Sequence, residues 1–107
     1  MGGGGAVAER LPLVTTPRRA PARNALGLTA REAQIVRGCA VGLTRAEIGD
    51  RLGIAPRTVQ THLEKAYRVT GFGGKGALPA LTYAMGVADA GRESEARQLC
   101  PALADAE

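Results

Sequence analysis

The sequence predicts an all-α protein: a compact four-helix module with a flexible basic N-terminal arm and an acidic C-terminal tail. Apolar residues between positions 28 and 88 recur at helical spacing, and glycine or proline separates the helical stretches. No segment alternates polar and apolar residues with a period of two, so we expect no sheet. Aromatic residues make up 3% of the 107 residues, so small aliphatic side chains must form most of the core.

Length and composition exclude several classes of protein. A chain of this length fits one small domain with tails. No apolar run approaches the roughly 18 residues of a membrane helix. The first ten residues lack the basic and apolar segments of a signal peptide, and Ala6 breaks the myristoylation pattern. We therefore expect a cytoplasmic protein without membrane contact, with Cys39 and Cys100 as free thiols.

Charge is distributed unevenly along the chain. The balance is +3 over residues 1–27, +4 over residues 28–88 and −3 over residues 89–107. Basic N-terminal and central segments followed by an acidic C-terminal segment weakly favour nucleic-acid binding.

Residues 1–24 are expected to form a flexible leader, because four consecutive glycines and three prolines prevent regular structure. The alternative is a basic arm that follows DNA through Arg18, Arg19 and Arg23.

The first helix is predicted over about 29–41. Thr29 and Glu32 have the spacing of a capping box, and Gly42 ends the helix. Its apolar positions are Ala33, Ile35, Val36, Cys39, Ala40 and Val41.

The second helix is short, and a tight turn joins it to the third. Thr44 and Glu47 form another capping box, Ile48 and Leu52 make an apolar pair, and Gly53 ends the helix near residue 52. A short helix and a glycine turn before a longer helix are typical of a helix-turn-helix.

The third helix, about 56–70, has a polar outer face that suits a DNA major groove. Pro56 fits the first helical turn, and Gly71 is a natural stop. At about 100° per residue, the inward stripe is Val59, Leu63, Ala66 and Thr70. The outer face consists of Arg57, Thr58, Gln60, Thr61, Glu64, Lys65 and Arg68. Such side chains pair with base edges and phosphates, although any soluble helix also exposes a polar face.

The fourth helix is predicted over about 77–90, with Pro79 tolerated in its first turn. We expect Leu78, Leu81 and Met85 to mediate dimerisation, because about 61 residues make a marginal core. The alternative is that this helix completes the core of the monomer. The tail, residues 91–107, is expected to be either disordered or a short helix.

Many of these residues match a known family in register. The chain resembles the LuxR-type helix-turn-helix, a DNA-binding module of bacterial regulators, over about 28–88; we place the domain at 25–90. The matching residues are Leu28, Thr29, Arg31, Glu32, Gln34, Ile35, Val36, Ala40, Gly42, Leu43, Thr44, Glu47, Ile48, Leu52, Ile54, Thr58, Val59, His62, Leu63 and Gly71.

The resemblance implies a third helix that enters the major groove and a fourth that often dimerises on a pseudo-palindromic site. It places Gln60, Thr61 and Glu64 where family members commonly touch bases, and Lys75 where a cation meets phosphate. Gln60 replaces a frequent lysine, and Ala55 replaces the usual capping residue. Because 27 residues are too few for a sensor domain, we expect a stand-alone effector.

The predicted function is sequence-specific binding of double-stranded DNA by a nucleoid-associated homodimer that regulates transcription. Base contacts are assigned to Arg57, Thr58, Gln60, Thr61 and Glu64. Phosphate contacts are assigned to Thr44, Arg45, His62, Lys65, Arg68 and Lys75. Two alternatives are a sigma-factor-like module on RNA polymerase and a protein-interaction module with weak DNA binding. No catalytic residue, metal, cofactor or small-molecule site is expected.

Overall fold

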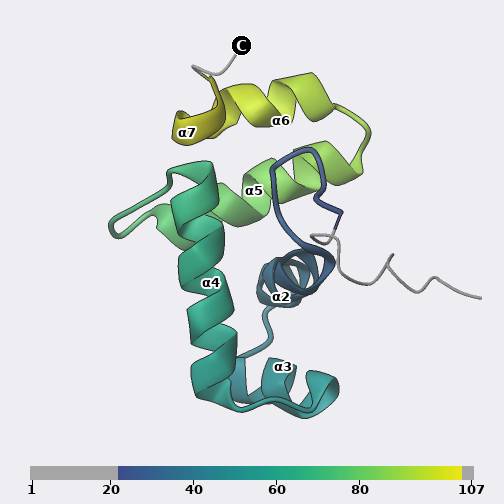
Figure 1. The fold of residues 1–107 in the computed structure, drawn as a ribbon, viewed down its shortest axis with the longest axis vertical. Helices are drawn as coiled ribbons and strands as arrows, with labels where there is room; N and C mark the ends of the chain where they lie inside the picture. Colours follow the sequence, from purple (N-terminus) through teal and green to yellow (C-terminus); the bar gives the residue numbers. More distant parts are fainter. Residues whose placement is uncertain (1–21, 105–107) are drawn as a thin grey trace, which may run out of the picture.

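The computed structural model describes residues 22–104 and folds them into six helices without a β-strand (Figure 1). The helices are α2 (Ala30–Ala40), α3 (Arg45–Leu52), α4 (Pro56–Thr70), α5 (Ala77–Asp89), α6 (Glu93–Leu99) and α7 (Pro101–Ala104). The predicted all-α class is confirmed. The proposed arm residues Arg18 and Arg19 lie outside the described residues.

The helices pack around the long helix α4. In Figure 1, α3 lies beside the lower end of α4, α2 is seen end-on beside its middle, and α5 and α6 lie one above the other near its upper end. The helix α7 contacts the C-terminal end of α4. None of the helices in the described part has the length and apolarity needed to cross a membrane.

The predicted helix ends are confirmed. Thr29 and Thr44 each cap a helix, and in both boxes the carboxylate of the glutamate three residues on accepts a hydrogen bond from the backbone N–H of the threonine. Gly53 and Gly71 end α3 and α4 in the left-handed conformation, with φ of 72° and 87°. Local sequence therefore fixes where these helices start and stop.

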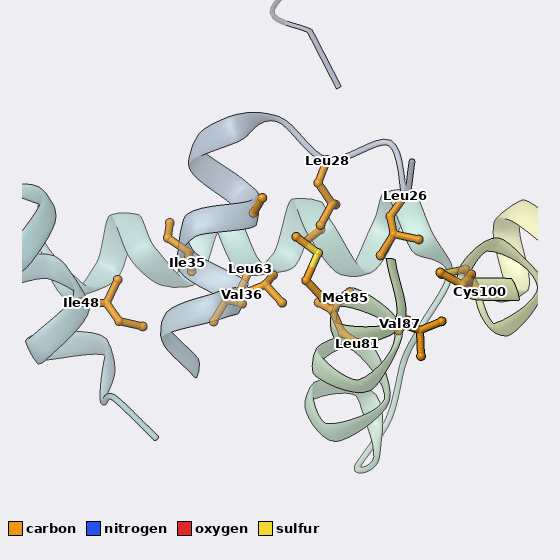
Figure 2. Close-up of a cluster of buried hydrophobic side chains, with 14 of the residues drawn as sticks. Leu26, Leu28, Ile35, Val36, Ile48, Leu63, Leu81, Met85, Val87 and Cys100 are labelled. Carbon is orange, nitrogen blue, oxygen red and sulfur yellow. The ribbon is translucent and has the colours of Figure 1, made fainter. Parts of the chain in front are cut away.

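The core lies where α2, α4 and α5 meet (Figure 2). The buried residues of α4 are the four predicted ones, Val59, Leu63, Ala66 and Thr70. The Thr70 hydroxyl donates to the Ala66 carbonyl at 2.7 Å, so this buried polar group is satisfied.

Two expectations about apolar residues are wrong. Leu81 and Met85 are 0% and 1% exposed in the core of the monomer, so they cannot form the predicted dimer surface. Leu78 is half-buried and packs against the same core. Val41 is 76% exposed, because α2 ends at Ala40 and the chain turns away from the core there.

The fold begins with a tight turn before α2 that the sequence analysis did not predict. The Asn24 side-chain oxygen accepts hydrogen bonds from the backbone N–H groups of Leu26 and Leu28, both at 2.9 Å. Both leucines are fully buried. An asparagine that binds backbone donors two and four residues on is a typical turn former, so the residue type was a usable signal.

The C-terminal segment folds onto the module as two helices. Ala96 and Cys100 are fully buried, α6 packs against α5, and α7 packs against the end of α4. The Arg97 guanidinium donates to the Ala25 carbonyl at 2.8 Å and so ties α6 to the turn before α2. The sequence analysis expected this segment to be either disordered or a short helix. The structure has the short helix, α6, followed by the further helix α7.

Candidate nucleic-acid interface

The outer face of α4 is exposed to solvent. Arg57, Thr58, Thr61, Glu64, Lys65 and Arg68 are all exposed, and Gln60 is half-buried at the edge of the face. The opposite side of the helix is completely buried. This division follows from the rotation of about 100° per residue along the helix. It leaves the polar side free to enter a DNA major groove, which is wide enough for one helix.

A glycine inside α3 allows the turn between α3 and α4 to pack closely against that helix. Gly49 is buried within α3, and a Cβ atom there would lie 2.5 Å from the Ile54 carbonyl oxygen. The Ile54 N–H donates to the Gly49 carbonyl at 3.0 Å. The missing side chain lets the turn approach α3 closely and thereby sets the position of α4. An isolated glycine inside a helical pattern was the available signal.

Four cations near this face have no partner in the described part of the chain. Within residues 22–104, no hydrogen bond or ion pair engages the side chains of Arg57, Lys65, Arg68 or Lys75. All four are exposed. Unpaired cations are available to neutralise phosphates, which supplies most of the non-specific affinity for DNA.

A network of three side chains joins α3 to α4. The Arg45 Nε–H donates to Gln60 Oε1, and Gln60 Nε2 donates to Glu64 Oε2 at 3.2 Å. The sequence analysis assigned these residues separately, Arg45 to phosphate and the other two to bases. Because Arg45 belongs to another helix, its partnership with Gln60 could be seen only in the fold.

Two threonines of the predicted site bind the backbone. Thr44 Oγ1 accepts from the Glu47 N–H at 3.1 Å and so caps α3. Hydrogen bonds from the Thr44 backbone and side chain lower the pKa of the Glu47 carboxyl. Thr61 Oγ1 donates to the Arg57 carbonyl at 3.1 Å, so the hydroxyl oxygen can still accept a hydrogen bond.

Comparison with known proteins identifies this arrangement. Residues 26–69 match the family model of bacterial regulatory proteins of the luxR family, and the match contains α2, α3 and most of α4. This segment is a LuxR-type helix-turn-helix domain. The resemblance inferred from the sequence is confirmed, and the domain is of a DNA-binding type found in transcription regulators.

Three curated relatives match the LuxR-type domain. Each bears the name "Putative HTH-type transcriptional regulator"; one is from Mycobacterium bovis and two are from strains of Mycobacterium tuberculosis. Each is 44% identical over 54 residues, which is 50% of this chain. The match covers 6% of the length of each relative. No solved structure gives a significant match.

His62 is poorly placed to contact phosphate through one of its ring nitrogens. The side chain is half-buried, and Nδ1 is buried without a hydrogen-bond partner among the described residues. Only the other side of the ring is left for an outside partner.

Residues 22–104 contain no cluster of three potential metal ligands. Both thiols are free, and burial raises the pKa of Cys39 and of Cys100. A neutral thiol is a weaker nucleophile and a poorer metal ligand than a thiolate. The candidate interface is the outer face of α4 and the residues beside it.

Proposed function

We propose that this chain is a sequence-specific DNA-binding transcription regulator that inserts α4 into the major groove. The observation that carries the proposal is the exposed face of α4 with its unpartnered cations. The family match and the names of the relatives support the same function.

Base contacts on this proposal come from Arg57, Thr58, Thr61 and Glu64, all exposed on one side of α4. A well-placed contact discriminates between bases by about 1–3 kcal/mol. Phosphate contacts come from Thr44, Arg45, Lys65, Arg68 and Lys75. His62 cannot contact a phosphate through its buried Nδ1 atom. The positive end of α3, which Thr44 caps, adds a backbone site for one phosphate.

Selection of bound duplexes from a random pool, followed by salt titration on the selected and random sequences, tests this proposal. We expect an enriched sequence that binds about 10³-fold or more tighter than random duplex. Enrichment of no sequence, together with capture of RNA polymerase subunits, would favour the sigma-factor-like alternative instead.

We further propose that the regulator binds as a homodimer through the outer face of α5. This face presents Tyr83, which is 63% exposed, together with Pro79, Gly86 and Ala90. None of the four side chains is charged, so burying this face against a second copy does not require the removal of water from a charged group. A symmetric dimer would match a pseudo-palindromic site.

A further inference from the structure

We propose that Gln60 is a positioning residue that holds Arg45 and Glu64, and that Glu64 selects a cytosine in the DNA site. The inference rests on the proposed function, since it concerns which side chain recognises the base. It replaces the expectation that Gln60 itself contacts a base.

Both ends of the Gln60 amide are occupied. Oε1 accepts from the Arg45 Nε–H, while Nε2 donates to Glu64. Bidentate recognition of adenine needs these same two atoms at once, one to accept from N6 and one to donate to N7. Gln60 would have to break both bonds in order to contact an adenine. Its half-buried position at the edge of the α4 face also places it behind its exposed neighbours.

Glu64 retains the capacity to accept a hydrogen bond from a base. A carboxylate has two oxygens and about four acceptor sites, and the structure gives one hydrogen bond to Oε2 from Gln60. The side chain is exposed on the outer face of α4. Gln60 Nε2 restricts the carboxylate to one orientation before DNA arrives, which lowers the entropy lost on binding.

The chemistry of an acceptor-only group favours cytosine. In the major groove the amino groups of cytosine and adenine are the donors. Adenine presents the N7 acceptor beside its amino group, and this lone pair repels a carboxylate. Cytosine presents its N4 amino group without an adjacent acceptor on the same base, so it is the better partner for Glu64.

Arg45 reduces the cost of placing a carboxylate near DNA. Its guanidinium lies on the far side of the same amide, so the three groups form a cation–amide–anion series across α3 and α4. The positive charge offsets the repulsion between Glu64 and the phosphates. The remaining guanidinium N–H groups of Arg45 can donate to a phosphate.

The test compares Gln60→Ala, Glu64→Gln and the double variant with the wild-type protein on the selected duplex and on duplexes with each base pair exchanged. We expect the wild type to prefer cytosine at one position by roughly 5- to 150-fold. Glu64→Gln should abolish that preference or shift it to adenine, because the amide adds a donor. Gln60→Ala should weaken the preference without changing the preferred base, and the double variant should equal Glu64→Gln.

Loss of an adenine preference in Gln60→Ala, with Glu64→Gln unchanged at that position, would show direct recognition by Gln60 and overturn the inference. A selected site with no cytosine preference that depends on Glu64 would also overturn it and leave the proposed function intact. Failure of the wild type to select any duplex would reject the proposed function instead. Glu64 is exposed and Gln60 lies at the edge of the exposed face, so thermal melting should confirm unchanged folding.

A measurement on the free protein tests the bridge separately. In NMR spectra, hydrogen exchange of the Arg45 Nε–H should be slowed in the wild type, and Gln60→Ala should accelerate it. Arg57 provides the internal reference, since the structure gives its guanidinium no partner in the described region. Equal exchange of the two arginines would contradict the bridge.

Discussion

Arg37 and Asp89 form an ion pair with two hydrogen bonds that joins α2 to the end of α5. Arg37 Nε and Nη2 donate to the two carboxylate oxygens at 2.8 and 2.7 Å. The hydrogen bond from Arg37 has the largest effect and lowers the pKa of Asp89. Burial opposes it, and the charge of Arg37 adds a smaller lowering effect. The partners are 52 residues apart, so the sequence alone did not show the pair.

Asp89→Asn should destabilise the domain by up to about 1 kcal/mol at pH 7, because the pair is largely exposed. Since the pKa of Asp89 is lower in the folded state, the stabilisation is present above the unfolded pKa of about 4 and is lost as the pH falls through the folded value. Urea unfolding at several pH values measures this, and the difference from wild type should shrink below pH 4. A difference independent of pH would contradict the assignment. Glu95→Gln, at a pair 3.9 Å apart, is the control.

Lys75 is an exposed cation in the loop between α4 and α5, without a partner in the described residues. Lys75→Ala should weaken binding to selected and random duplexes alike and reduce the salt slope by about 0.9. Fluorescence anisotropy across a salt series provides the measurement. Arg92→Ala, between α5 and α6, should leave the slope unchanged; an equal loss there would indicate a bulk charge effect.

At the scale of elements, the angle between α3 and α4 depends on a glycine in contact with backbone. Gly49→Ala places a methyl group against the Ile54 carbonyl oxygen and should cost about 1–3 kcal/mol or more. Gly73→Ala is the control, since the loop between α4 and α5 leaves open space there and the substitution should change stability by less than about 1 kcal/mol. Chemical denaturation distinguishes the two. Equal stabilities would show that the turn adapts without strain.

The helices α6 and α7 pack onto the core of the fold, although the family match ends at residue 69. They bury Ala96 and Cys100, and the Gly71 turn lies against Ala102, where a Cβ would approach its backbone nitrogen to 2.5 Å. These contacts place them against α5 and the end of α4, away from the outward face of α4.

A chain ending after residue 91 should therefore melt at a temperature several degrees lower than the full chain, because core side chains become exposed. Gln98→Ala, an exposed substitution in α6, is the control and should have little effect. Calorimetry on the full and shortened chains gives the comparison. An unchanged melting temperature would mean that the two helices add nothing to the core.

At the scale of the whole molecule, the proposed dimer uses the side of α5 that the core leaves uncovered. Tyr83→Glu would place a charge in that interface and should convert a dimer into a monomer, as sedimentation equilibrium would detect. Binding to a two-half-site duplex should weaken far more than binding to one half-site. A wild-type protein that is monomeric both free and on DNA would reject this surface.

Local patterns predicted much of the fold because their physical causes are local. Two capping boxes, the glycine stops and the helical repeat of α4 depend on residues a few positions apart, and the structure confirms each. The four inward residues of α4 were predicted from the repeat alone. Leu81 and Met85 were assigned to the wrong surface, because periodicity shows that a face is apolar and not what covers it.

The sequence by itself determined the helices α2 to α5, their ends and the polar face of α4, since these follow from hydrogen bonds and side-chain spacing within single segments. Only the tertiary structure decided that α5 is buried by its own chain, that α6 and α7 close over it, and that Arg45 reaches Gln60. These outcomes depend on packing between distant segments, whose relative positions are fixed by the shared core and by no local rule.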